Sequence, residues 1–227
     1  MKIEVKNISK EFQTDTVSTM ALNNVSLTVD DGEFVAIMGP SGCGKSTLLN
    51  ILGLLDNPTA GEYMIDGTEV GKLRENGRTR FRKGRLGFIF QSFNLIDEMN
   101  VRDNIMLPLH NLPLSSAEKN RRVDEAMRRM GIAPRSNHYP SQLSGGQQQR
   151  AAIARAVVAQ PGLILADEPT GNLDSKNGAE VMELLDELHR EGATIVMVTH
   201  SQKDAAHADR IINLFDGQIV ENLNNLM

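Results

Sequence analysis

Apolar and polar positions alternate over two early stretches, Ile3 to Ile8 and Val25 to Val29, which is the period of half-buried strands. Phe34 to Met38 is instead wholly apolar, which indicates a strand buried on both faces. A glycine-rich segment follows it at once, and Lys45 to Leu55 then predicts a helix. The start of the chain therefore contains three strands, a tight loop and a helix in that order.

Patterns typical of strands and of helices continue to the other end of the chain. Short strands are expected over Glu62 to Ile65, Leu86 to Phe90, Leu163 to Ala166, Ala193 to Thr199 and Ile211 to Leu214. Helices are expected after Ser115, from Gln147 to Ala159, and around the apolar stripe Val181, Leu184, Leu185 and Leu188. Strands alternating with helices around a helical insert predict an α/β fold.

We expect a single domain over 1–227, with a mostly parallel sheet core, an antiparallel N-terminal lobe and a helical lobe. The core with its antiparallel lobe is expected over about 1–91 and 159–227, and the helical lobe over about 92–158. Within that lobe, Ser115 and Glu118 have the spacing of a capping box. Gly131 is expected to end the helix that they begin.

Composition narrows the class of protein without naming a function. Of the 227 residues, 40% are hydrophobic and 23% charged, as in an ordinary globular domain, and the net charge of −5 offers no general attraction to nucleic acid. The longest apolar stretch, Ala151 to Ala159, is interrupted by Arg155 and is too short to span a bilayer. The single cysteine and the absence of an apolar leader predict a location inside the cell.

Residues Gly39 to Ser46 match the pattern G-x-x-x-x-G-K-[ST] between a buried strand and a helix. Glycines let several backbone amides point at one anion, and the lysine and serine then serve the terminal phosphates and Mg²⁺. A chance glycine turn would not explain the order of strand, loop and helix. The candidate nucleotide-binding residues here are Gly39, Ser41, Gly42, Cys43, Gly44, Lys45, Ser46 and Thr47.

Asp167 and Glu168 follow the predicted strand that begins at Leu163. Carboxylates at the carboxyl end of such a strand lie where ligands of these sheets bind. We predict that Asp167 holds Mg²⁺ through water and that Glu168 is the general base for the attacking water. Taken alone, an Asp-Glu pair is more often a solvated loop, so the assignment depends on the phosphate loop.

Further motifs, in order, resemble the nucleotide-binding domain of an ATP-binding cassette (ABC) transporter over essentially the whole chain. Leu143 to Gln147 reads Leu-Ser-Gly-Gly-Gln and is similar to the signature of that family, and Asn172 to Asp174 is similar to its dimer-contact loop. Gln91, His200 and Phe12 stand where the family has a loop glutamine, a switch histidine and an adenine-stacking aromatic.

The resemblance implies a head-to-tail homodimer that binds ATP and Mg²⁺. Ser144, Gly145, Gly146 and Gln147 would complete the ATP site of the other chain, with Asp174 in the contact loop. Gln91 would touch Mg²⁺ and the attacking water, His200 would donate to the γ-phosphate, and Lys45, Gln91, Glu168 and His200 would form the catalytic set. A simple helix start, an ordinary loop glutamine and a structural histidine are the alternatives.

Phe12 and Cys43 carry two separate hypotheses. Phe12 lies just past a strand and is either an adenine platform or part of the core. Cys43 either fills a free position of the loop or, close to a helix N-terminus, has a lowered pKa. In the second case, alkylation of the thiol is expected to block ATP binding.

The arginine-rich stretch from Arg74 to Arg85 has the appearance of a nucleic-acid patch but lacks interleaved aromatics apart from Phe81. We expect a solvated loop there and no nucleic-acid partner.

Thr170 to Asp174 reads Thr-Gly-Asn-Leu-Asp and is similar to cassettes of lipoprotein release, macrolide export and cell division. The resemblance implies a separate membrane permease of the lipoprotein-release, macrolide- or peptide-export type, with this chain peripheral on the inner face of the cell membrane. An apolar cluster is expected either to line the groove that receives the permease or to pack under the helical lobe; it comprises Phe93, Leu95, Ile96 and Met99. The alternative function is a soluble or signalling ABC ATPase, of the cell-division or nucleic-acid repair type, that moves no solute.

Overall fold

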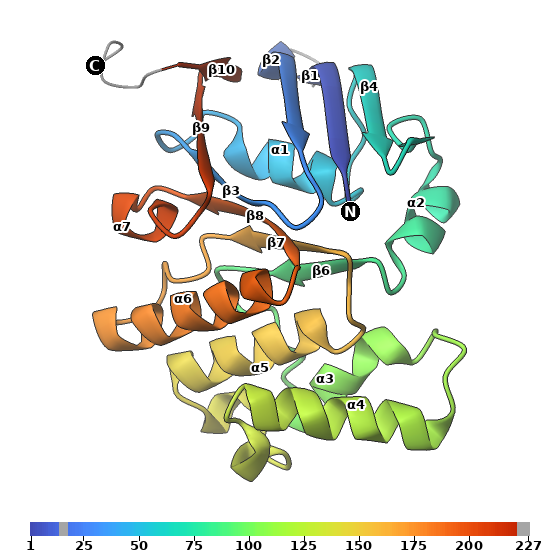
Figure 1. Cartoon of the computed structure of the whole chain (residues 1–227), viewed down its shortest axis with the longest axis vertical. Coiled ribbons are helices and arrows are strands. Elements are labelled where there is room, and N and C mark those ends of the chain that lie inside the picture. Colours follow the sequence, from blue (N-terminus) through green and yellow to red (C-terminus); the bar gives the residue numbers. More distant parts are fainter. Residues whose placement is uncertain (14–17, 222–227) are drawn as a thin grey trace. The chain divides into compact units, whose positions relative to one another are not determined.

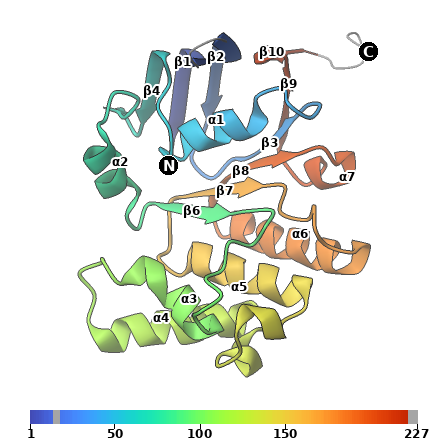
Figure 2. The ribbon, with the colours of Figure 1, turned by 180° about the vertical axis from the view of Figure 1, so that it is seen from behind.

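A computed structural model describes residues 1–13 and 18–221. The chain divides into two compact units, the first formed by residues 1–82 together with the segment from Gly192 onward, and the second by Lys83–Glu191. Figure 1 labels most of the helices and strands of the two units, and Figure 2 shows them from behind. No helix in the described part of the chain is long and apolar enough to cross a membrane.

The first unit contains a four-stranded antiparallel sheet in the order β2-β1-β4-β5. Its strands are β1 Ile3–Gln13, β2 Ser18–Val29, β4 Ala60–Ile65 and β5 Thr68–Glu69. β1 and β2 are both longer than the sequence pattern predicted. Register shifts interrupt their pairing beyond Val5, Ile8 and Lys10. Each shift displaces the alternation of apolar and polar positions, so the sequence pattern shows only part of each strand.

The first unit also contains four adjacent strands in the order β10-β9-β3-β8. β3 Phe34–Met38 pairs in parallel with both β8 Thr194–Thr199 and β9 Arg210–Phe215, and β10 Gln218–Val220 is antiparallel to β9. α1 Lys45–Leu52 lies between these strands and the antiparallel sheet (Figures 1 and 2).

The prediction of a loop from Arg74 to Arg85 is wrong, because Glu75–Arg82 form helix α2. None of its residues is buried, so the helix has no apolar stripe that a sequence pattern could show. Arg82 anchors it by donating to the carbonyl of Leu54. The short helix α7 Gln202–Ala205 is the other helix of this unit that the sequence pattern did not predict.

The second unit contains two parallel strands, β6 Leu86–Ile89 and β7 Leu163–Asp167. Its central helix is α5 Gly145–Val157, which contacts β6 and three other helices. These are α3 Val101–Met106, α4 Ser116–Arg129 and α6 Ser175–Arg190. Three short 3-10 turns, η1 Leu107–Leu109, η2 Ala133–Arg135 and η3 Pro140–Gln142, complete the unit.

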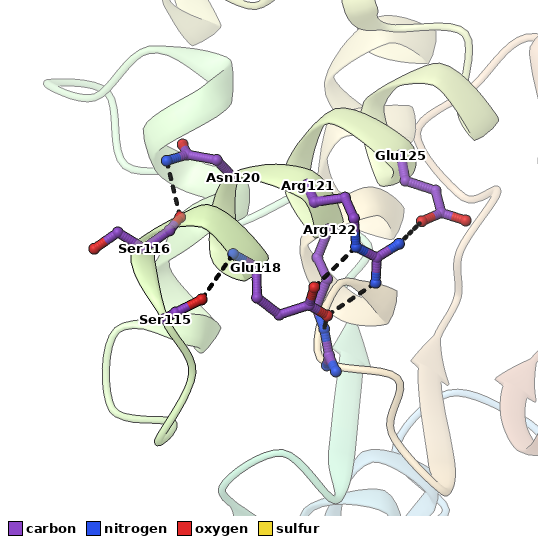
Figure 3. A network of polar contacts seen from close by, with 7 residues as sticks. All are labelled: Ser115, Ser116, Glu118, Asn120, Arg121, Arg122 and Glu125. Atoms are coloured by element: carbon purple, nitrogen blue, oxygen red, sulfur yellow. Dashed lines mark hydrogen bonds and ion pairs between the residues drawn. The ribbon is translucent and has the colours of Figure 1, made fainter.

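Helix α4 begins as predicted at Ser115, whose hydroxyl accepts a hydrogen bond from the amide of Glu118 at 3.2 Å (Figure 3). The second half of the predicted capping box is not formed. The carboxylate of Glu118 instead pairs with Arg121 at 2.8 Å and with Arg122 at 2.7 Å. Hydrogen bonds from these two guanidinium groups lower the pKa of Glu118 to about 2.

Candidate functional site

The glycine-rich loop leads from β3 into α1 in the order that the sequence predicts. The side chain of Lys45 is buried, and its Nζ donates to the carbonyl oxygens of Gly39 at 2.9 Å and Pro40 at 2.8 Å. The ammonium group is therefore held inside the curve of its own loop. Backbone amides at the start of α1 and a fixed cation are groups that suit a phosphate, and the binding role of this loop stays a prediction.

Glycine is required in this loop for two different reasons. A Cβ at Gly39 would lie 2.1 Å from the carbonyl oxygen of Leu214, and a Cβ at Gly44 would lie 2.4 Å from that of Ala21. Gly42 has open space around it but a φ of +79°, which other residues rarely adopt. Packing therefore requires glycine at positions 39 and 44, and backbone conformation favours it at position 42.

The lowered pKa expected for the Cys43 thiol is wrong. The side chain is buried, and burial raises its pKa above the ordinary value, although the charge of Lys45 acts in the opposite direction. The thiol is therefore a packing group, and the rapid alkylation on which the hypothesis depended is not expected. Of the two interpretations of Cys43, the structure favours the one in which it fills a free position of the loop.

The register of two parallel strands brings His200 to the phosphate loop. Met38 of β3 pairs with Thr199 of β8, so Gly39 and His200 each follow the last pair of the same ladder. His200 is exposed at this carboxyl end of the strands, where ligands of parallel sheets bind.

Phe12 lies on β1 and is 45% exposed, so the alternative that it belongs to the core is wrong. The Nζ of Lys10 lies 5.0 Å from the centre of its ring. The face of an exposed aromatic ring beside a cation is a suitable platform for a base, and the adenine role stays a prediction.

In the second unit, a similar register brings Gln91 to the acidic pair. Ile89 of β6 pairs with Ala166 of β7, and Gln91, Asp167 and Glu168 follow at the same strand ends. Glu168 has a φ of +44°, in the left-handed region that is costly for a side chain of this size. Such strain is concentrated at functional sites, where the surrounding structure maintains it.

Gln91 also contacts the loop that follows Glu168. The Nδ2 of Asn172 donates to the carbonyl of Gln91 at 2.9 Å, and a Cβ at Gly171 would lie 2.7 Å from the Gln91 Nε2. Asn172 of the motif Thr-Gly-Asn-Leu-Asp therefore holds the backbone at Gln91. A side chain in place of Gly171 would clash with the side chain of Gln91. This contact could not be predicted from a local pattern, because Gln91 and Asn172 are 81 residues apart in the chain.

The signature segment opens α5 two residues earlier than expected. Ser144 is the N-cap, and it forms a capping box with Gln147 in which each side chain accepts from the backbone of the other. Gly146 packs against Asn177 of α6, whose own side chain donates to Asp174 at 2.6 Å. Hydrogen bonds from Asn177 lower the pKa of Asp174, so its carboxylate stays charged as the cap of α6.

Two side chains of α5 that sequence reasoning missed reach the loops of this site. Gln149 is fully buried, and its Nε2 donates to the carbonyl of Pro169, next to Glu168, at 2.6 Å. Arg155 donates to the carbonyls of Phe93, at 2.8 Å, and Asn94. The one available signal was Arg155 itself, a charge in the longest apolar stretch of the chain.

A cavity of about 280 Å³ lies in the second unit beside the glutamine loop. Its lining is mostly apolar and comprises Gly84, Leu86, Gly87, Phe88, Phe90, Asn94, Pro108, Arg155, Ala156 and Ala159. Of the apolar cluster expected either to line a permease groove or to pack under the helical lobe, Ile96 is 38% exposed, and Phe93, Leu95 and Met99 are half-buried. The cluster is therefore accessible in part, while some of its surface packs within the unit.

The parallel strands, the phosphate loop before α1 and the acidic pair after β7 define an α/β nucleotide-binding protein of the P-loop class. Residues 22–171 match the protein family described as ABC transporter. Together with the relatives described next, this match shows that the chain belongs to the ABC transporter family, and it is an ATP-binding, ATP-hydrolysing member. The resemblance and the fold class expected from the sequence are confirmed.

Similar proteins cover nearly all of this chain. It is 50% identical over 222 residues to the uncharacterized ABC transporter ATP-binding protein MJ1508 of Methanocaldococcus jannaschii, covering 98% of this chain and 99% of that protein. It is 49% identical over 218 residues to the macrolide export ATP-binding/permease protein MacB of Chlorobium luteolum, covering 96% of this chain. The chain spans only 33% of the length of that MacB protein.

Solved structures agree with the fold. A dimeric structure of the ATP-binding cassette MJ0796 in a post-hydrolysis state, bound to ADP and Pi, is 44% identical to this chain with a TM-score of 0.89. The alignment covers 97% of both chains. A second dimeric structure of MJ0796, titled a bacterial ABC transporter cassette, is 46% identical with the same TM-score.

Proposed function

We propose that this chain is the ATPase of an export system, in which ATP closes a dimer of cassettes and hydrolysis reopens it to drive a membrane permease. The phosphate loop, with its buried Lys45 and tightly packed glycines, carries the proposal. MacB relatives at almost half identity support the export type. The dimeric MJ0796 cassettes support association of two copies.

Each candidate residue has a role that its own chemistry supports. Lys45 contacts the β- and γ-phosphates, and Glu168 accepts a proton from the attacking water. His200 donates a hydrogen bond to the γ-phosphate, and Phe12 stacks on adenine. Ser46, Gln91 and Asp167 supply oxygen atoms that suit Mg²⁺, which neutralises phosphate charge when it is bound.

The dimer is proposed to be head to tail. The amides of Gly145 and Gly146 and the hydroxyl of Ser144 stand at the start of the 13-residue helix α5, which favours an anion. In this arrangement, each signature segment completes the ATP site of the other chain, and Asp174 lies in the contact loop.

The permease is proposed to be a separate chain, and this ATPase to lie against it on the inner face of the membrane. The match with MJ1508 covers 99% of that protein, whose name mentions only ATP binding, and this supports an ATPase and a permease on separate chains. The names of the MacB relatives, in contrast, combine ATP-binding and permease. The partly exposed cluster of Phe93, Leu95, Ile96 and Met99, near the apolar cavity, suits an amphipathic segment of such a partner.

Substitution Glu168→Gln tests the hydrolytic site. The variant is expected to bind ATP with unchanged affinity and to lose at least about a hundredfold in kcat, since the general base is removed. Lys45→Ala is expected to lose most nucleotide binding. The measurements are phosphate release and equilibrium binding of a fluorescent ATP analogue.

Glu183→Gln is the matched control, because Glu183 is an exposed glutamate on α6. It is expected to leave both measurements unchanged. Hydrolysis by Glu168→Gln at the wild-type rate would remove Glu168 from the role of base. A wild-type protein that binds no ATP would contradict the proposed function altogether.

A further inference from the structure

Arg155 is a half-buried charged residue in the last turn of α5. Ala151 and Ala152, one turn before it on the same side of the helix, are fully buried. A guanidinium group that is partly removed from water gains by donating its N–H groups to acceptors of the protein. It does so with backbone oxygens, donating to the carbonyl of Phe93 at 2.8 Å and to that of Asn94.

The backbone that receives these hydrogen bonds is strained. Phe93 has a φ of +61° and Asn94 a φ of +49°, so two successive residues are left-handed. This conformation is unfavourable for an ordinary residue, although asparagine tolerates it better than phenylalanine. The turn is tight, since the Asn94 amide donates to the carbonyl of Ser92 at 2.6 Å. Such a turn persists only where other groups hold it.

We propose that Arg155 is a positioning residue for ATP hydrolysis, which holds the strained turn at Phe93 and Asn94 and thereby fixes the backbone of Gln91. The inference rests on the proposed role of Gln91 near the attacking water. Arg155 lies on the same helix that the signature residue Ser144 opens. The two hydrogen bonds of its side chain therefore connect that helix to the glutamine loop.

Arg155→Met tests this role, because methionine keeps the apolar stem and removes the donors. The kcat for ATP is expected to fall about tenfold or more, since small misplacements of a positioning group are costly in rate, while the KM for ATP stays within about twofold. Arg155→Lys keeps the charge without the fork of donors and is expected to lose less. A kcat equal to that of wild type in either variant would overturn the proposal. If Arg155→Met does not fold, Arg155→Lys alone provides the test.

Arg150→Met is the matched control. Arg150 is on the same helix and also anchors a backbone carbonyl, that of Met130, at 3.2 Å, and it pairs with Glu180. It does not touch the glutamine loop. The control is expected to lower the midpoint of thermal unfolding without lowering kcat. An equal loss of kcat in Arg150→Met would show a general effect of helix stability and overturn the proposal.

Asn94→Gly provides a rescue that a merely structural role of Arg155 would not show. Glycine adopts a left-handed backbone without strain, so the turn then depends less on Arg155. In the Arg155→Met background, Asn94→Gly is expected to restore at least about threefold in kcat, because it removes part of the conformational cost. No recovery would contradict the positioning role.

Hydrogen exchange gives a readout apart from catalysis. Amides of residues 91–96 are expected to exchange faster in Arg155→Met than in wild type, while those of α4 stay unchanged. Equal exchange of residues 91–96 in both proteins would overturn the proposal. If wild type hydrolyses ATP and Glu168→Gln does not, the proposed function stands whatever Arg155 does, so the two failures are distinguishable.

Discussion

At the scale of single residues, hydrogen-bonding partners decide chemistry that residue type alone does not. The carboxylate of Glu118 has the spacing to cap its own helix, yet it pairs with Arg121 and Arg122 one turn further on. Two guanidinium donors offer charge-assisted bonds, which are stronger than a bond to a backbone amide. The sequence therefore predicted the start of α4 correctly but not the partners of Glu118.

Substitution Glu118→Gln makes this ion-pair cluster testable by pH. The folded pKa of Glu118, about 2, is below its ordinary value of 4.5. Its contribution to stability is therefore present above pH 4.5 and is lost as the pH falls toward 2. We expect the variant to unfold at a lower temperature than wild type at pH 7, and the difference to shrink at pH 3.

Thermal unfolding followed by circular dichroism measures both differences, with Glu98→Gln, at an exposed glutamate, as the control. Because the cluster is exposed, 1 M salt is expected to reduce the effect at pH 7. A difference in midpoint that is the same at pH 7 and pH 3 would be inconsistent with this ion-pair cluster.

At the scale of elements, the buried strands were predictable and the exposed ends were not. β3 has the predicted bounds because every residue from Phe34 to Met38 is apolar, whichever face it occupies. The far ends of β1 and β2 are mostly exposed and irregular in register, so no period marks them. α2 lacks an apolar stripe altogether.

The motifs of the candidate site were also readable from the sequence, whereas the contacts that support them were not. The order of a strand, a glycine-rich loop and a helix is visible in the sequence. Polar residues that directly follow an apolar strand are visible in the same way. A side chain that binds a distant carbonyl, as Gln149 binds that of Pro169, leaves none. Packing of the second glycine of the signature against Asn177 likewise requires the folded chain.

Replacing each glycine of the signature by alanine is expected to change the stability of the protein by different amounts. A Cβ at Gly146 would lie 2.2 Å from the Oδ1 of Asn177, whereas a Cβ at Gly145 meets nothing closer than 3.7 Å. Gly146→Ala must displace Asn177 and weaken its bond to Asp174, and we expect a loss of about 1 to 3 kcal/mol in the free energy of unfolding. Gly145→Ala is the internal control.

Urea unfolding measures the two free energies. Because alanine favours a helix over glycine, Gly145→Ala is expected to be neutral or slightly stabilising. Equal destabilisation by both substitutions would mean that the close approach to Asn177 does not determine the requirement for glycine.

At the scale of the whole molecule, the arrangement of two copies determines which residues share a site. In the proposed head-to-tail dimer, Lys45 and Glu168 serve the ATP of their own chain, and Ser144 serves that of the partner. Chains with defects on opposite sides of this division can therefore complement each other, whereas chains with defects on the same side cannot.

A mixture of Lys45→Ala and Ser144→Arg chains is expected to regain ATPase activity, although each is inactive alone. Half of the dimers at equal mixing would carry one complete site, which gives about a quarter of the wild-type rate if the sites act independently. Phosphate release by the mixture measures it. A mixture of Lys45→Ala and Glu168→Gln is the control and is expected to stay inactive; activity only in that control would refute the head-to-tail arrangement.

The bonds from Lys45 to Gly39 and Pro40 affect how any change at this lysine is interpreted. The amine stabilises the curve of its own loop in addition to its proposed contact with phosphate, so Lys45→Ala would remove both interactions in one step. The resulting defect reports the sum of both. Acylation of the amine would have the same double consequence, because it would remove the positive charge together with donors to the two carbonyls.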